Sequence, residues 1–286
     1  MNQLIEKISW LPYSLLCKIK NNSKKVVELD LRKVGISKKF AFNIVPDDAG
    51  LSTQLRTFKL REPLNLEYHW SFVEKKDNVL DLGANIGVFS ALSSNANKII
   101  SVEPIEKAIP FLKKNLELNN LSGKSEVIRM AGGKKGWLFL EEDEKLNLSR
   151  VVDKENEKTQ KVRSEPLSYF VKKYGTNLLR MDVEGYEYEI LYDNIPKGIN
   201  KISIEFHTNL MGKEKVRKLI DYFYKEGFMI ETLIEDLPIR LYPFHGLLRK
   251  TGLIKKFTYV KKNLNKEAAL RFINSGRAQK YLFLRR

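Results

Sequence analysis

The chain has 286 residues, one cysteine and a formal net charge of +16, with 51 Lys and Arg against 35 Asp and Glu. A chain of this length can bury one large core, so one main domain is expected, and the lone Cys17 excludes an internal disulfide framework. The single cysteine also fits a reducing compartment, so a cytoplasmic protein is expected. No apolar run reaches the roughly 18 residues of a membrane span, and the positive charge favours anionic partners.

Residues 1–60 are expected to form a lead-in to the main domain. The segment LIEKISWLPYSLLCKIKNNSKK, residues 4–25, is apolar and then basic, but Glu6, Pro12 and the lack of a small-residue cleavage site do not fit a signal peptide. We expect a docked helix here, with a membrane-surface anchor as the alternative. Residues 25–34 and 38–46 alternate polar and apolar side chains around Gly35, which predicts an antiparallel hairpin.

From residue 78 onward, the pattern alternates between strands and helices. Strands are expected at residues 78–84, 98–104, 125–131, 136–142, 177–183, 201–207, 228–235 and 280–286. Helices are expected at residues 87–96, 106–119, 164–175 and 213–227, and in a segment that begins at residue 185. Residues 143–163 are polar and show no clear periodicity. This order predicts a doubly wound, mostly parallel α/β sheet within a unit of residues 61–286.

The carboxyl ends of the first two strands carry the expected cofactor site, because ligands of open parallel sheets bind beyond those ends. The residues placed there are Asp81, Gly83, Ala84, Asn85, Gly87, Glu103 and Pro104. The glycines allow close approach to the backbone, and Glu103 suits the hydroxyls of a ribose. The loop lacks the dinucleotide pattern G-x-G-x-x-G, and Asp81 favours a ligand with positive groups, such as S-adenosylmethionine. The alternative is a glycine turn that serves only helix packing.

Four titratable residues follow the next two strands of the sheet. Asp182 and Glu184 follow the fourth strand, while Glu205 and His207 lie on one face of the fifth because they are two residues apart. We expect a catalytic cluster of Asp182, Glu184, Glu205 and His207. Each residue also has an ordinary explanation, such as a helix cap or a structural histidine, and Glu187 and Glu189 are expected on a solvated helix face.

Several successive motifs resemble those of the FkbM family of S-adenosylmethionine-dependent methyltransferases, over roughly residues 60–235. They are VLDLGANIGVFS, ISVEPIEKAIPFLKKNLELN, LLRMDVEGYEYEIL and ISIEFH. The resemblance implies a Rossmann-like class I methyltransferase sheet of seven strands with the last antiparallel, and usually O-methylation of a sugar, polyketide or related small molecule. It also implies that Asp81, Gly83, Asn85, Gly87 and Glu103 bind the cofactor, and that Asp182 and Glu184 border the reacting centre.

Residues 237–277 form a basic insertion between the last two expected strands. It contains ten Lys or Arg against the single acid Glu267, interleaved with aromatic residues. Because the preceding strand ends at the ligand face of the sheet, we expect the insertion to leave from that face and to cover or shape the acceptor site. A solvated helical appendage is the alternative.

The expected chemistry is an in-line methyl transfer, with His207 or Asp182 as the base that takes a hydroxyl proton. Asp182, Glu184 and Glu205 also suit magnesium, but no metal is assigned from the sequence. The expected acceptor is a hydroxyl-bearing sugar, glycan, lipid or other small molecule, and the net positive charge is compatible with an anionic one. The alternatives are an RNA methyltransferase, for which the expected N-P-P-Y or D-P-P-Y signature is lacking, and a non-catalytic binding protein. Peripheral membrane contact is a further expectation.

Overall fold

The computed structural model describes Leu15 and residues 25–46, 48, 50–141, 150–152, 157, 159–275 and 279–286. The expected N-terminal helix, and the membrane anchor that is its alternative, fall outside this set apart from Leu15. Among the residues that the structure describes, no helix has both the length and the apolar character needed to cross a bilayer.

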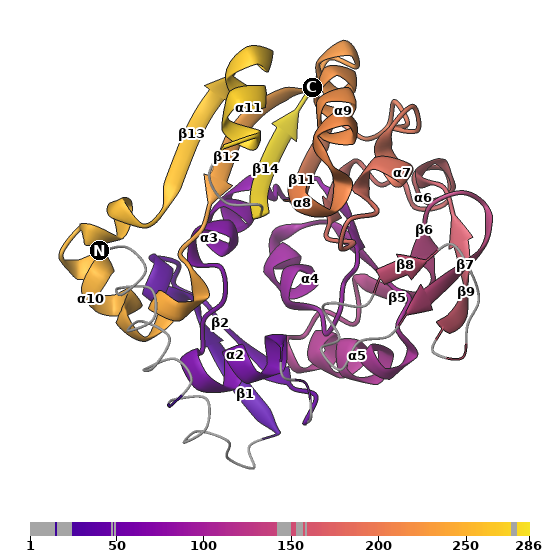
Figure 1. The fold of residues 1–286 in the computed structure, drawn as a ribbon. Coiled ribbons are helices and arrows are strands. Elements are labelled where there is room, and N and C mark those ends of the chain that lie inside the picture. Colours follow the sequence, from indigo (N-terminus) through magenta and orange to yellow (C-terminus); the bar gives the residue numbers. More distant parts are fainter. Residues whose placement is uncertain are drawn as a thin grey trace.

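An eight-stranded mixed sheet forms the centre of the fold (Figure 1). Its spatial order is β13-β12-β14-β11-β10-β3-β4-β5. The strands are β3 (Asn78–Leu82), β4 (Lys98–Glu103), β5 (Ser125–Arg129), β10 (Leu178–Met181), β11 (Lys201–His207), β12 (Met229–Glu235), β13 (Tyr259–Leu264) and β14 (Gln279–Arg285). Strands β5, β4, β3, β10 and β11 are mutually parallel, and β14 is antiparallel to both of its neighbours. This order confirms the expected α/β methyltransferase sheet, to which the insertion adds β13 as an eighth strand.

Successive residues of the central strands point to opposite faces, and both faces are covered. Val79 belongs to one apolar cluster and Leu80 to the other. The first cluster includes side chains of α3 (Pro63–Phe72), α4 (Val88–Leu92) and α5 (Ile109–Leu118). The second includes side chains of α6 (Leu167–Tyr174), α7 (Glu187–Leu191), α9 (Lys213–Lys225) and α11 (Lys266–Ile273). Burial on both faces explains why these strands are continuous apolar runs in the sequence.

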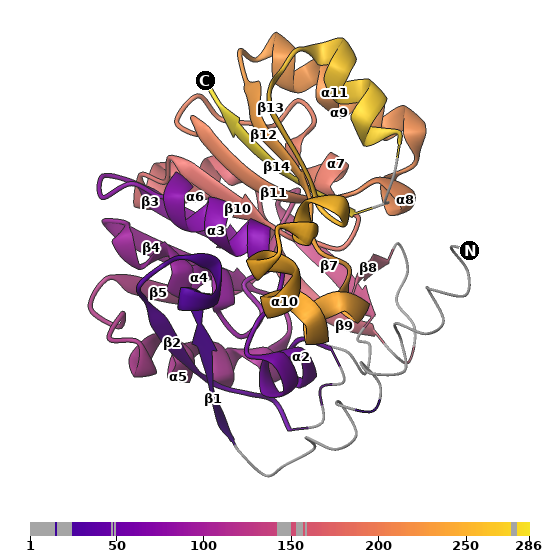
Figure 2. The ribbon, with the colours of Figure 1, turned by 90° about the vertical axis from the view of Figure 1, so that its left-hand side faces the viewer.

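The lead-in contains the predicted hairpin, formed by β1 (Val26–Asp30) and β2 (Lys39–Asn43) around the 3₁₀ segment η1 (Leu31–Val34). Two amide side chains bind the edge of β2: Asn115 in α5 and Asn119 directly after it. Asn43 N–H donates to Asn115 Oδ1 at 2.6 Å, and Ala41 N–H donates to Asn119 Oδ1 at 2.9 Å. These bonds dock the hairpin, which lies with α2 (Leu51–Phe58) at the end of the molecule opposite α9 and α11 (Figure 2).

The polar stretch after residue 142 contains strands that the sequence did not predict. A second sheet has the order β6-β9-β7-β8, from β6 (Ala131–Gly132), β7 (Gly136–Glu141), β8 (Arg150–Val152) and β9 (Thr159–Glu165). Of these, only β7 was expected. β9 carries one buried apolar side chain, Val162, so its sequence lacks the apolar alternation by which a strand is recognised.

The insertion divides into a helical part, a strand and a return helix. The helical part comprises η5 (Ile239–Phe244), α10 (His245–Lys250) and η6 (Leu253–Lys256), and is followed by β13 and α11. It is attached to the start of α3: Tyr242 Oη accepts the N–H of Glu62 at 2.8 Å, and Arg249 pairs with Glu67 at 3.3 Å. The remaining short segments are η2 (Ser93–Asn95), η3 (Glu106–Ala108) and α8 (Thr208–Met211).

Candidate active site

A pocket lies at the carboxyl ends of the central parallel strands, where the sequence placed the ligand site. It contains about 930 Å³ of empty space, including its opening to solvent. Its walls include Asp81, Gly83, Ala84, Asn85, Glu103 and Pro104 of the expected cofactor set. Gly87 lies just behind them, at the start of α4 with φ of +89°. Its missing Cβ would lie 2.7 Å from Leu112 Cδ1, which explains this glycine by helix packing.

Gly83 is required by the close approach of two strand ends. A Cβ at this position would lie 1.8 Å from the carbonyl oxygen of Asp182, and the φ of Gly83 is +76°. Its N–H and that of Ala84 both donate to the Val102 carbonyl, at 3.0 and 3.1 Å. The turn after β3 is therefore held between β10 and β4, with its backbone open to the pocket.

Glu103 connects the two loops that flank the pocket. Its Oε2 accepts the N–H of Asn85 at 2.7 Å, and its Oε1 accepts the N–H of Ile105 at 2.8 Å. Burial raises the pKa of Glu103 to about 7, although these two hydrogen bonds act in the opposite direction. Each carboxylate oxygen accepts more than one hydrogen bond, so Glu103 can also receive hydroxyl donors from a ligand.

Asp81 and Arg180 form the charged floor of the pocket. Ser90 Oγ donates to Asp81 Oδ2 at 2.6 Å, and Arg180 Nη1 lies 4.0 Å from Asp81 Oδ1. Burial raises the pKa of Asp81, and the charge of Arg180 partly offsets this effect. The guanidinium of Arg180 lies 3.9 Å from the ring centroid of Phe89 and 3.4 Å from Asp182.

Sequence reasoning did not identify Arg180 or Arg61 as part of this site. Arg180 had a signal, because it is the one charged residue of the buried strand LLRM and such a residue needs a buried partner. No sequence pattern pointed to Arg61. It lies between α2 and α3, lines the pocket, and pairs with Glu62 at 2.5 Å.

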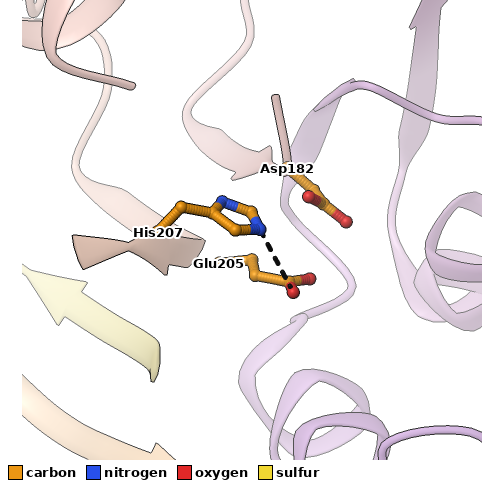
Figure 3. A group of neighbouring side chains, drawn as sticks. All are labelled: Asp182, Glu205 and His207. Atoms are coloured by element: carbon orange, nitrogen blue, oxygen red, sulfur yellow. Dashed lines mark ion pairs between the residues drawn. The ribbon is translucent and has the colours of Figure 1, made fainter. Parts of the chain in front are cut away.

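The four predicted catalytic side chains lie together beside the pocket. His207 Nε2 lies 3.3 Å from Glu184 Oε2 and 3.5 Å from Glu205 Oε1. Asp182 faces the same group from the end of β10 (Figure 3). Asp182 and Glu184 line the pocket, whereas Glu205 and His207 lie behind them.

Glu187 corrects the expectation of a solvated helix face. Its side chain is fully buried, and its Oε1 lies 2.6 Å from His207 Nδ1 and accepts the N–H of Gly185 at 3.1 Å. Glu189, in contrast, is partly exposed and pairs with Lys215 at 2.5 Å. The sequence could not separate the two because α7 is too short to show a helical period.

Burial and mutual charge perturb the whole cluster. Burial, followed by the charge of Asp182, raises the pKa of Glu184 and of Glu205 to about 8. Burial disfavours the imidazolium of His207, but hydrogen bonds to Glu187 and Glu205 outweigh this effect and raise its pKa to about 12. Burial likewise opposes ionisation of Asp182, but Arg180 and His207 hold its pKa below the ordinary value.

Comparison with known proteins gives a family match for this part of the chain. The family model described as the methyltransferase FkbM domain matches residues 81–230. That range contains the expected cofactor-binding residues and the cluster around His207, whereas Arg61 lies outside it. Among curated proteins, none matches the sequence significantly.

Three solved structures illustrate the more distant likenesses. A protein of the NADB-Rossmann superfamily from Streptococcus agalactiae has 11% identity, a TM-score of 0.43, and coverage of 79% of this chain and 69% of that one. The M. jannaschii tRNA m1G37 methyltransferase has 16% identity and a TM-score of 0.42, and the match covers 87% of this chain but only 52% of that enzyme. The precorrin-6y C5,15-methyltransferase of Geobacter metallireducens has 10% identity, a TM-score of 0.39 and coverage of 77% and 86%. Likenesses this distant carry nothing about substrate.

Proposed function

Because the chain belongs to the FkbM family of methyltransferases, we propose that it transfers the methyl group of S-adenosylmethionine to a hydroxyl group of a sugar, glycan, lipid or other small-molecule acceptor. The observation that carries this proposal is the pocket at the ends of β3, β4 and β10. Its walls include the backbone of Gly83, the buried carboxyl group of Glu103, and the carboxyl groups of Asp182 and Glu184.

We expect the donor to bind this pocket with its ribose at Glu103 and its methionine end at Gly83. Glu103 accepts hydrogen bonds from the ribose hydroxyls, as an acid at the end of the second strand does in nucleotide-binding sheets. The methionine end then lies near Gly83 and Asp81, where a carboxylate favours the positive ammonium and sulfonium groups. The methyl group is thereby directed toward Asp182 and Glu184 on the remaining wall.

The reaction breaks the bond between the methyl carbon and sulfur and forms a bond from that carbon to the acceptor oxygen. The electron pair stays on sulfur, giving S-adenosylhomocysteine, and the hydroxyl proton passes to a base. Asp182 is the better candidate for this base than His207, because Asp182 lines the pocket and its buried Oδ1 has no hydrogen-bond partner. Holding the two reactants in line supplies most of the acceleration in such a transfer.

The basic insertion supports an anionic acceptor or an anionic surface that carries it. Lys255, Lys256 and Lys262 are exposed, and so are the apolar side chains of Leu247 and Leu253. Basic and apolar groups side by side suit the headgroup region of an anionic membrane, which favours a lipid-linked acceptor. None of the described insertion residues lines the pocket, so the insertion would hold a distant part of the acceptor.

RNA methylation is the second candidate, and one observation favours it. Lys261 Nζ lies 5.2 Å from the ring centroids of both the exposed Tyr259 and the half-buried Phe272, and charged groups beside accessible rings suit phosphates and bases.

Transfer of a tritiated methyl group to separate glycan, lipid and RNA fractions tests both candidates. The first predicts label in the glycan or lipid fraction, lost in Asp182→Asn. Label confined to RNA would promote the second candidate, and no label in any fraction despite bound donor would contradict both.

A further inference from the structure

Three metal-ligand side chains meet where β10 and β11 end. One ligand atom each from Asp182, Glu205 and His207 lies within 4.8 Å of the other two (Figure 3). The ligand atoms of a tetrahedral ion with bonds of about 2.1 Å are about 3.4 Å apart, so the three atoms must approach one another by up to about 1.4 Å to bind one ion.

Two carboxylate oxygens of this group are buried and have no hydrogen-bond partner. They are Asp182 Oδ1 and Glu205 Oε2, the second in a residue that is 2% exposed. The other Glu205 oxygen accepts a hydrogen bond from Gln279 and lies 3.5 Å from His207 Nε2. Buried polar atoms nearly always have a partner, so two unpartnered oxygens beside the histidine indicate a ligand that binds here.

Glu187 fixes the histidine ring in the orientation that a metal ligand needs. His207 Nδ1 lies 2.6 Å from Glu187 Oε1, and this contact holds the ring with Nε2 on the side of Glu184 and Glu205. An ion that binds here would replace the proton that Nε2 carries toward these carboxyl groups, because a metal-bound imidazole nitrogen must be deprotonated. A carboxylate behind a histidine is the usual support of a metal-bound imidazole.

We propose that Asp182, Glu205 and His207 bind a divalent first-row transition-metal ion. One imidazole nitrogen with two carboxylate oxygens suits Zn²⁺ or Mn²⁺, whereas Mg²⁺ prefers oxygen ligands alone. These ligands differ from the three carboxylates that the sequence showed as suited to magnesium, because Glu184 turns its Oε2 toward His207. Binding of the ion does not depend on the proposed function, but the role of the ion in catalysis rests on it. Because Asp182 lines the pocket, the ion would bind the acceptor hydroxyl and make its proton more acidic.

Calorimetric titration of the full-length, chelator-treated protein with Zn²⁺, Mn²⁺ and Mg²⁺ tests this site. We expect one Zn²⁺ or Mn²⁺ per chain, bound at least about tenfold more tightly than Mg²⁺. His207→Asn should lose most of this affinity, and Glu187→Gln should weaken it by about 10–100-fold, as loss of a supporting carboxylate does. Glu205→Gln keeps the size of the side chain and should also bind weakly if His207→Asn fails to fold.

His245→Asn is the matched control. His245 is another buried histidine with an unpartnered Nε2, but it lies on α10 outside the cluster. Its loss should leave metal affinity unchanged. The inference is overturned if the wild type binds neither Zn²⁺ nor Mn²⁺ at one per chain, or if the variants of Glu205 and His207 bind as tightly as the control. S-adenosylmethionine binding by the same preparation separates the two proposals, since donor binding without metal binding contradicts only this one.

Discussion

Replacing Gly83 by Ala should disrupt the junction between β3 and β10 and the donor site that it forms. The added Cβ would lie 1.8 Å from the carbonyl oxygen of Asp182, far inside any contact distance. The backbone must move to relieve this overlap, at a cost of about 1–3 kcal/mol for an overpacked site. The left-handed φ of +76° adds about 1–2 kcal/mol for a residue with a side chain.

Gly227→Ala separates the two contributions. Gly227 has a nearly equal φ of +83°, but a Cβ there would meet nothing within 4 Å. It should therefore show the backbone cost alone and keep full donor affinity. Urea unfolding measures the free energy of each variant, and calorimetry measures binding of S-adenosylmethionine. If Gly83→Ala costs no more than Gly227→Ala and binds the donor as tightly as the wild type, the close approach at Gly83 has no role in the site.

Further substitutions test the donor site, the base, a buried histidine and the insertion. Glu103→Ala should weaken S-adenosylmethionine binding by about tenfold or more, because charge-assisted hydrogen bonds contribute about 1.5–3 kcal/mol each; unchanged calorimetry would contradict the ribose role. Asp182→Asn should lower methyl transfer by about 10²–10⁴ with little change in melting temperature, whereas a collapse of stability would indicate a structural role. Burial, with the charges of Arg180 and Lys201, lowers the pKa of His69 to about 3, so the unfolded chain takes up a proton below pH 6.5 that the folded chain does not. Stability should therefore fall by about 1.4 kcal/mol per pH unit from pH 6.5 toward pH 3, and pH-dependent unfolding of His69→Gln should lack this component. Replacing four insertion lysines by Ala, namely Lys255, Lys256, Lys261 and Lys262, should weaken acceptor binding and reduce its salt dependence, and should leave donor binding unchanged. If this variant binds the acceptor as tightly as the wild type at both low and physiological salt, the insertion is only an appendage.

The central sheet was predictable because each of its strands is recognisable from a short stretch of neighbouring residues. Strands buried on both faces appear as apolar runs, and the ends of parallel strands lie on one edge, which places Asp81, Glu103, Asp182 and Glu205 together without coordinates. The position of His207 beside Glu205 was predictable as well, since residues two apart share a strand face.

The remaining features depend on contacts between distant segments. Glu187 could not be separated from Glu189 by helical period, and only the position of His207 shows which of them is buried. Arg61 reaches the pocket from a loop with no periodic pattern. The strand β9 is polar because it is partly exposed, so its pairing with β7, not its composition, defines it.

Titration of the purified protein with S-adenosylmethionine tests the central claim most directly. The account predicts one donor molecule per chain, with a dissociation constant below about 1 mM, and loss of most of that affinity in both Gly83→Ala and Glu103→Ala. Absence of binding by the wild type, or wild-type affinity in both variants, would contradict the assignment of this pocket.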